Sequence, residues 1–481
     1  MAGAGAHLAP PALFTDLYQL TMLQAYHDEG LREMAVFELF VRRLPPRRNV
    51  LLACGLGDAL RYLERLRFDS DALDYLASLG LFTSGFLEEL GRLRFTGDVR
   101  ALPEGTPVFA GEPLLQVRAP LPQAQLVETC LLNQVHFQTL AASKALRVVR
   151  AASGRPVVDF GMRRIHGTDA ALKAARAFHV AGAAATSNVL AGRVYGLPLS
   201  GTMAHSYVQV HGGDAEAFRA FAASHREPVL LVDTVDTLAG VREVARLARA
   251  LGEDFRVRAV RLDSGDLAEL ARGARAILDE AGLAGVQVFA SGGLDEEEVA
   301  RLVAAEAPID GFGVGTRMGV SADAPFLDCA YKLVEYAGKA RLKLSGGKET
   351  LPGGKEVFRV SRGGEDVLDV VARAGEEAAA VLEEVRGRAG AGDLGSGAAE
   401  GGAPLAVRPV LADVMRRGRR LAAGEESLDA ARERAAAGLV RLPGRIRDLA
   451  PAEPPYPVLV SAALSSERER RAAELRSRIG V

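Results

Sequence analysis

The sequence contains no tryptophan, few cysteines and no marked excess of charge of either sign. The three cysteines, Cys54, Cys130 and Cys329, lie far apart and lack CxxC spacing. This pattern indicates neither a disulfide framework nor a zinc site, and it favours a reducing compartment, the cytoplasm. The formal net charge is -2, whereas proteins that follow nucleic-acid phosphates carry a basic excess on one face. We therefore expect no DNA or RNA partner.

Long apolar runs are also missing. No segment reaches the roughly 18 uninterrupted apolar residues of a membrane-spanning helix, and the first residues lack the basic and apolar regions of a signal peptide. We expect neither a membrane partner nor a targeting signal. With 481 residues, the chain is long enough for two domains, or for a barrel with a substantial accessory domain.

Residues 1–125 predict an accessory α+β domain. Apolar side chains recur at spacings of three and four in TDLYQLTMLQAYHDEG and GLGDALRYLERL, which predicts two helices. The stretch AVFELFVRRLP between them predicts a strand. Residues 94–118 alternate short apolar runs with proline and glycine turns, a pattern typical of small antiparallel strands.

We predict that residues 126–335 form the catalytic domain and that this domain is an α/β barrel. After a long helix that begins near Gln125, one unit repeats: an apolar run, a polar turn and a helix. The runs are PVVDFG, PLSGTMAHS, PVLLVD, VRAVRLDSG, VQVFASGG and IDGFGVGT. Runs without alternation indicate strands buried on both faces of a parallel sheet. An open doubly wound sheet would give the same local pattern, but the polar turns that follow the strands favour an irregular barrel.

We predict that residues 336–481 form a C-terminal segment. This segment and the N-terminal segment together would build the accessory α+β sandwich. Short strands are expected in YKLVEYAGKARLKLSG and KEVFRVSR, on either side of the turn GGKETLPGGKE. Residues 389–404 offer almost no bulky apolar side chain, which predicts a flexible loop. A charged helix is expected from Ser465 onward.

Two glycine-rich turns at late strand ends predict a phosphate site. They lie in ASGGLDEEEVA and DGFGVGTRM, each just before an expected helix. In barrels the turns after the last two strands commonly bind phosphate through backbone N–H groups. Gly292, Gly293, Gly315 and Thr316 are the candidates. The alternative is that these glycines only close tight turns.

A histidine follows another of the expected strands, in SGTMAHSYVQVHGG. His205 lies near Thr202 and Ser206, whose hydroxyls can donate to anionic oxygens. A histidine beside phosphate can act as acid, base or phosphoryl acceptor. A purely structural histidine is the alternative, and His166 and His211 are rivals that sequence spacing does not separate from it.

Three arginines lie in or after expected strands. Arg163 and Arg164 follow PVVDFGM, and Arg261 lies in AVRLDSGD. A guanidinium there can grip a carboxylate or pyrophosphate with two hydrogen bonds, although an internal ion pair with a neighbouring aspartate is as plausible. We place Arg261 and Asp263 with His205 as candidate catalytic residues.

Other strand-end aspartates, Asp233 and Asp266, together with Asp263, can position Mg²⁺ through water, orient a ribose or cap helices. No direct metal site is predicted. The convergence of phosphate turns, arginines and acidic residues indicates chemistry on a sugar phosphate or pyrophosphate.

Nine stretches of the chain, in order, resemble the nicotinate phosphoribosyltransferase family. They are TDLYQLTM, FELFVRRLP, DFGMRRIHG, SNVLAG, GTMAHS, LVDTVDT, VRLDSGDL, GFGVGT and TLPG. They extend over roughly the first three-quarters of the chain, up to the hairpin near KETLPGGKEVFR. The stretches RIHGTD and 389–404 depart from the family pattern.

The resemblance implies an enzyme that makes nicotinate mononucleotide and pyrophosphate from nicotinate and phosphoribosyl pyrophosphate (PRPP) in NAD salvage. It implies coupling to ATP through a phosphohistidine, Mg²⁺ that enters with PRPP, and a homodimer in which one subunit's sandwich covers the partner's barrel mouth. Tyr18 matches the residue that stacks on the pyridine ring, Thr202 and Arg261 match nicotinate-binding residues, Thr316 matches a PRPP-binding threonine, and His205 matches the phosphorylated histidine.

Rival functions stay open at this point. A nicotinamide or quinolinate phosphoribosyltransferase would use the same sugar donor, and a non-catalytic phosphate-binding barrel would retain the same turns. Arg261 favours a carboxylate over a neutral amide. A lyase or aldolase would need a strand-end lysine as Schiff-base nucleophile, and no expected barrel strand carries one.

Overall fold

The computed structural model describes residues 10–346, 349–390 and 403–479. It divides into two compact units. Unit 1 combines Met1–Leu140 with Phe326–Val481, and unit 2 is Ala141–Pro325. The chain therefore changes unit inside helix α6 (Glu128–Ala151) and again at Phe326, whereas the sequence analysis placed these transitions near residues 125 and 335. Most of the loop expected at 389–404 lies outside the described residues.

Unit 1 is built on a seven-stranded sheet that interleaves early and late parts of the chain. Its order is β13-β12-β1-β5-β3-β17-β18. The strands are β1 (Met34–Val41), β3 (Asp98–Ala101), β5 (Pro113–Pro120), β12 (Cys329–Tyr336), β13 (Lys339–Ala340), β17 (Ala412–Arg416) and β18 (Arg419–Arg420). Strand β1 pairs antiparallel with both β5 and β12. The sheet can therefore form only when the N-terminal and C-terminal segments meet.

Helices of the N-terminal segment bury the apolar side chains of this sheet. They are α1 (Leu17–Glu29), α2 (Leu56–Arg65), α3 (Ser70–Ser78), α4 (Ser84–Arg92) and α5 (Leu121–Leu126). Helix α2 shows the local logic: Leu56, Leu60 and Leu63 lie on one face at spacings of three and four, and all are buried in the core. A short pair, β2 (Leu51–Leu52) and β4 (Pro107–Val108), lies beside them.

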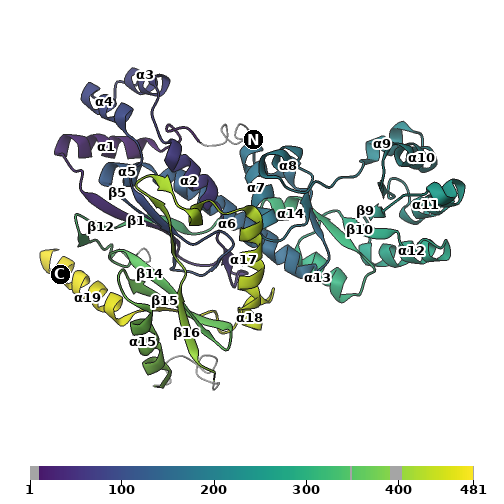
Figure 1. The fold of residues 1–481 in the computed structure, drawn as a ribbon. Coiled ribbons are helices and arrows are strands. Elements are labelled where there is room, and N and C mark those ends of the chain that lie inside the picture. The colour runs from purple at the N-terminus through teal and green to yellow at the C-terminus, as the bar shows by residue number, and fades with distance from the viewer. Residues whose placement is uncertain (1–9, 347–348, 391–402, 480–481) are drawn as a thin grey trace. The chain divides into compact units, whose positions relative to one another are not determined.

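A second, four-stranded sheet of unit 1 comes entirely from the C-terminal segment. Its order is β16-β14-β15-β19, and Figure 1 shows α15 beside it. The strands are β14 (Lys355–Arg362), β15 (Glu365–Arg373), β16 (Leu405–Pro409) and β19 (Val458–Val460). The helices that follow in this segment are α15 (Ala378–Gly390), α17 (Leu428–Val440), α18 (Gly444–Arg447) and α19 (Ala462–Ile479).

A buried polar cluster joins β14 and β15 to β4 and to Phe109, which follows β4. Arg359 donates from Nε to Asp369 Oδ1 at 2.9 Å and from Nη2 to Asp369 Oδ2 at 2.6 Å. The same Nη2 donates to the carbonyl of Pro107 at 2.8 Å. Tyr456 donates to Asp369 at 3.1 Å, and its ring stacks on Phe109 with centroids 3.8 Å apart. Removing one partner would leave a buried charge uncompensated, so the cluster acts as one unit.

A second carboxyl group, Glu112, belongs to this cluster and is fully buried. Burial raises the pKa of Glu112 well above its usual value, and the nearby Asp369 carboxylate raises it further. Glu112 Oε2 accepts a hydrogen bond from Phe109 N at 2.9 Å. The protonated form of Glu112 is therefore the form that the folded protein favours.

Replacing Glu112 with Gln tests this assignment. The unfolded chain ionises Glu112 near its ordinary pKa, while the folded chain retains the proton, so the wild-type free energy of unfolding falls as pH rises from that value through the folded pKa. A glutamine amide can donate to Asp369 without titrating. We expect Glu112→Gln to be more stable than wild type by about 1–3 kcal/mol near pH 8 and by less near pH 5, measured by urea unfolding.

The matched control is Glu365→Gln, at an exposed position of β15. It should leave the pH dependence of unfolding unchanged. A stability difference between wild type and Glu112→Gln that is the same at both pH values would show that folding does not raise the pKa of Glu112.

Unit 2 is a curled parallel sheet with helices between its strands. Its order is β7-β6-β11-β10-β9-β8. The strands are β6 (Val157–Asp159), β7 (Ala185–Thr186), β8 (Val229–Leu231), β9 (Ala259–Leu262), β10 (Gln287–Ser291) and β11 (Gly311–Val314). The helices are α7 (Thr168–Val180), α8 (Val189–Tyr195), α9 (His205–Val210), α10 (Asp214–Ser224), α11 (Thr237–Leu251), α12 (Leu267–Glu280), α13 (Glu296–Ala304) and α14 (Thr316–Gly319). The parallel α/β arrangement confirms that part of the expected fold class.

Two details of the expected barrel are wrong. Within the described residues the sheet is a half-barrel, with β7 and β8 as its two edges. The run PLSGTMAHS forms no strand, because only Leu199 makes a single parallel bridge, to Thr186. Pro198 lacks an N–H for a ladder and Gly201 disfavours extended pairing. The two-residue strand β7 was not predicted, since its surroundings, AAATSN, contain no bulky apolar run.

None of the helices in the described part of the chain is both long enough and apolar enough to cross a membrane.

Candidate active site

The carboxyl ends of β8, β9 and β10 bring several candidate residues together in unit 2. Parallel register places Leu231 beside Arg261, and Leu262 beside Ala290. Residues one or two positions beyond these pairs therefore meet at one edge of the sheet. Asp233, Asp263 and Ser291 meet there, and Arg261 reaches them from within β9.

Arg261 is held by contacts on several sides. Its Nε donates to Ser291 Oγ at 2.9 Å, and its Nη2 lies 3.1 Å from Asp263 Oδ1. Its Nη1 donates to the carbonyl of Met203 at 3.3 Å. The guanidinium also lies over the Phe160 ring, 5.6 Å from the centroid. The ion pair considered as an alternative does form with Asp263, and it orients the guanidinium.

Asp233 organises the turn that carries Asp263. Its Oδ2 accepts hydrogen bonds from Asp263 N at 3.0 Å and from Ser264 Oγ at 2.6 Å. Its side chain is only 1% exposed. Asp233 Oδ1 is buried and accepts no hydrogen bond from any residue in the described part of the chain. That free oxygen faces the side of the site where His205 lies.

His205 begins helix α9 and has a side chain 42% exposed. Its Nδ1 lies 3.2 Å from Thr234 Oγ1. Its Nε2 lies 3.9 Å from Asp233 Oδ1 and 4.0 Å from Asp263 Oδ2. The contact with Thr234 occupies one ring nitrogen and leaves the other for a reacting group. The structure thus places His205 between two carboxylates, and does not do so for His166, which is exposed in the segment before α7.

The two glycine turns also reach this edge, because β10 and β11 are neighbours. Gly292 has φ +91°, and a Cβ there would lie 1.8 Å from the carbonyl oxygen of Asp263. Gly293 has φ +65° but open space around it. Gly315 precedes α14, and the first residue of α14, Thr316, is exposed. That these residues bind phosphate stays a prediction. It requires the turns after β10 and β11 to lie side by side, as they do here.

The remaining candidates of unit 2 lie nearby in the chain but have different surroundings. Thr202 donates its hydroxyl proton to the carbonyl of Val229 at 2.6 Å, so in this state it can only accept a further bond. Ser206 is exposed on α9, and Arg163 and Arg164 are exposed in the 3₁₀ turn after β6. Their contacts with substrate stay predictions.

Asp159 does not form the ion pair considered for these arginines. It accepts hydrogen bonds from Gly161 N and Thr186 Oγ1, both at 2.7 Å. Burial raises the pKa of Asp159. Asp159 therefore fixes the turn after β6, from which Arg163 and Arg164 extend.

Sequence reasoning missed three residues of the site, Phe160, Ser291 and Gly313. A Cβ on Gly313 would lie 2.4 Å from the Phe160 ring, so the glycine leaves room for that ring under Arg261. The alternation of glycine with apolar residues in GFGVG was the available signal, because a glycine inside a strand often marks a close approach. Ser291 gave no signal beyond its place at a strand end.

Tyr18 lies in unit 1, on α1, and its side chain is about half exposed. Partial burial raises the pKa of Tyr18, and the nearby Glu128 and Asp16 carboxylates add to this. The phenol is therefore protonated at neutral pH. Its stacking on a pyridine ring stays a prediction.

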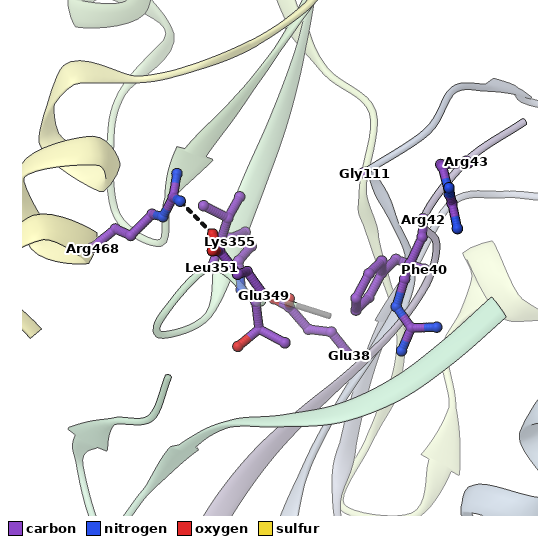
Figure 2. Close-up of a pocket in the computed structure, with 10 residues that line it drawn as sticks. Glu38, Phe40, Arg42, Arg43, Gly111, Glu349, Leu351, Lys355 and Arg468 are labelled. Atoms are coloured by element: carbon purple, nitrogen blue, oxygen red, sulfur yellow. Dashed lines mark hydrogen bonds and ion pairs between the residues drawn. The ribbon is translucent and has the colours of Figure 1, made fainter. Parts of the chain in front are cut away.

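Unit 1 also contains a cavity of about 440 Å³ for which the sequence analysis named no residue. Figure 2 shows Arg42 and Phe40 on one side and the Glu349–Leu351 stretch with Arg468 on the other. Lys355 donates to Glu38 at 2.5 Å, and Arg42 to Asp328 at 2.7 Å. The available signals were the stretches FELFVRRLP and TLPG.

Comparison with known proteins identifies the family of this chain. The model for the nicotinate phosphoribosyltransferase N-terminal domain matches residues 13–136, and the model for the nicotinate phosphoribosyltransferase family matches residues 155–343. The chain belongs to the nicotinate phosphoribosyltransferase family. A nicotinate phosphoribosyltransferase of Mycobacterium tuberculosis is 50% identical over 95% of this chain and 93% of its own.

Two further family members support the assignment. The enzyme of Bacillus subtilis named nicotinate phosphoribosyltransferase is 43% identical over 73% of both chains. The crystal structure of human nicotinic acid phosphoribosyltransferase superposes with a TM-score of 0.80 at 31% identity, covering 95% of this chain and 99% of that one. The family assignment made from the nine stretches is confirmed.

The turn that carries Gly292 gives a direct test of the site's packing. Gly292→Ala would combine a left-handed backbone with a clash against the Asp263 carbonyl, so we expect a loss of about 1–3 kcal/mol of stability. Gly293→Ala is the matched control, since it has positive φ and free space, and it should cost no more than about 1 kcal/mol. Urea unfolding of both variants measures the difference, and equal losses would contradict the close approach.

Proposed function

We propose that this protein transfers the phosphoribosyl group of PRPP to nicotinate, forming nicotinate mononucleotide and pyrophosphate. Family membership supports the reaction class. The observation that carries the proposal is the arrangement of Arg261, Asp263 and His205 beside two glycine turns at one sheet edge. Arg261 would supply a cation for the carboxylate of nicotinate. Asp263 would lie near the ribose, and the glycine turns would supply backbone N–H groups for the phosphate of PRPP.

Substrate binding would use opposite chemistry at the two ends of the site. Arg261 would hold the nicotinate carboxylate, and Thr202 would donate to the same carboxylate after its hydroxyl leaves the carbonyl of Val229. Gly292, Gly293, Gly315 and Thr316 would hold the 5-phosphate of PRPP through N–H and hydroxyl donors. The pyrophosphate would be contacted by Arg163, Arg164 and Ser206, because these three side chains are exposed to solvent.

In the proposed reaction, the bond between ribose C1 and the pyrophosphate oxygen breaks, and the leaving oxygen retains the electron pair. The pyridine nitrogen supplies its lone pair to C1, and the ring becomes a pyridinium. Positive charge develops on the ribose between these events, so Asp263 would stabilise it electrostatically. Fixed positions of both substrates supply most of the remaining rate enhancement, and no protein nucleophile attacks carbon.

Mg²⁺ is proposed to enter with PRPP, where it would neutralise charge on the leaving pyrophosphate. The free Oδ1 of Asp233 and the carboxylate of Asp263 fit such an ion held through water. Within residues 10–346, 349–390 and 403–479, no group of three or more His, Cys, Asp or Glu side chains could hold a metal ion.

Coupling to ATP is proposed to act through His205. Its Nε2 would attack the terminal phosphorus of ATP, and ADP would leave with the electron pair of the broken bond. Water would later cleave the phosphoryl–nitrogen bond. The hydrogen-bond distance from Nδ1 to Thr234 supports Nε2 as the acceptor, since the contact fixes the ring. Phosphorylation would bias the site toward the substrate-binding geometry.

We also propose a homodimer with a shared active site, in which Tyr18 of one subunit stacks on the nicotinate of the other. The half-exposed Tyr18 ring supports this, because an aromatic face is free for a partner. A cytoplasmic location is part of the proposal, and it is supported by the three cysteines, which form no disulfide in the described part of the chain.

The function is tested by pyrophosphate release with PRPP and Mg²⁺. Nicotinate, nicotinamide and quinolinate are compared, each with and without ATP. We expect nicotinate-dependent release that ATP enhances, because Arg261 selects a single carboxylate on the ring. Release with nicotinamide or quinolinate instead would indicate a sister enzyme, and no release with any of the three would indicate a binding protein.

The phosphohistidine is tested by His205→Ala. The variant should lose all ATP stimulation and show at least roughly a tenfold lower kcat/KM, because no phosphoryl acceptor remains. His166→Ala, at the exposed rival position, should retain ATP stimulation. Full stimulation in His205→Ala would remove His205 from the mechanism.

A further inference from the structure

Ser291 ends β10 and lies between the two charged candidates of the site. Its hydroxyl oxygen is 2.5 Å from Asp263 Oδ1 and accepts from Arg261 Nε at 2.9 Å. The residue is only 2% exposed. Its hydroxyl is engaged by Arg261 and Asp263, so we expect any effect of Ser291 on the reaction to pass through these two residues.

The direction of these hydrogen bonds is fixed by chemistry. A serine hydroxyl has one proton, and Arg261 Nε is only a donor, so Ser291 accepts from Arg261 and donates elsewhere. Its two possible acceptors are Asp263 Oδ1 at 2.5 Å and the carbonyl of Leu262 at 3.3 Å. The nearer, charged acceptor takes the proton.

Together Ser291 and Asp263 occupy one whole edge of the guanidinium. Ser291 Oγ accepts a hydrogen bond from Nε, and Asp263 Oδ1 forms an ion pair with Nη2 at 3.1 Å. These two nitrogens form the side edge of the planar fork. The Met203 carbonyl takes one N–H of Nη1 at 3.3 Å. Hydrogen bonds within the described residues use Nε–H and one N–H of Nη1, and the ion pair with Asp263 faces Nη2, so one N–H on Nη1 and at least one on Nη2 are left for a ligand.

We infer that Ser291 is a positioning residue that makes Arg261 present its end edge, Nη1 with Nη2, to the carboxylate of the substrate. The inference rests on the proposed function and deepens it. A carboxylate on that edge makes two parallel hydrogen bonds, whereas a neutral amide can accept only at its oxygen. Without the Ser291 oxygen, Nε would need another acceptor, and the side edge would compete for the carboxylate.

The test compares Ser291→Ala with wild type. We expect the KM for nicotinate to rise about tenfold, with kcat within about threefold and the KM for PRPP unchanged. The preference for nicotinate over nicotinamide in kcat/KM should fall by a similar factor, because nicotinamide does not use the two-point contact. Ser224→Ala, an exposed serine at the end of α10, is the control and should match wild type.

A double-substitution cycle separates positioning from general packing. Arg261→Lys removes the fork, so adding Ser291→Ala to it should not weaken nicotinate binding further, measured by calorimetry. Thermal unfolding confirms that each variant is folded. An unchanged nicotinate KM in folded Ser291→Ala, or equal additional losses in the lysine background, would overturn the inference. If wild type shows no nicotinate-dependent turnover, the proposed function fails, and the inference fails with it.

Discussion

Parallel pairing of β9 with β8 and β10 is the constraint on which the rest of the site depends. The backbone register sets Leu231 beside Arg261, and Leu262 beside Ala290. Residues 233, 263 and 291 then leave the sheet at the same edge, although about 30 positions separate each from the next. Successive side chains of a strand point to opposite faces of the sheet. A one-residue slip of β9 would therefore turn the Arg261 side chain away from Ser291.

Most polar groups of the site are paired with one another. Arg261 shares Asp263 with Ser291, and Asp233 satisfies backbone and hydroxyl donors of the Asp263 turn. The burial of Asp233 would be costly without these donors. Its Oδ1 accepts no hydrogen bond within the described residues, and a buried acceptor of this kind favours a donor or a cation as its partner. In unit 1, the cluster of Arg359 and Asp369 is held together in the same way, because each buried charged group has a partner.

Several features of the fold follow from sequence periodicity alone. Unalternating apolar runs predicted five of the six strands of the unit 2 sheet, since both faces are covered by helices. The closure of a barrel was wrong, because PLSGTMAHS reads as apolar while Pro198 and Gly201 prevent a ladder. The cavity at Arg42 and Lys355 was missed, since its walls come from β1 and from a turn more than 300 residues later.

The sequence by itself determined the family, the parallel α/β character and the identity of the candidate residues, because motif order and hydrophobic period are local properties of the chain. Only the tertiary structure decided which candidates meet. It put His205 rather than His166 between two carboxylates, turned the Thr202 hydroxyl toward Val229, and placed Ser291 against Arg261. These choices depend on strand register and side-chain rotamers, which long-range hydrogen bonds fix and sequence spacing does not encode.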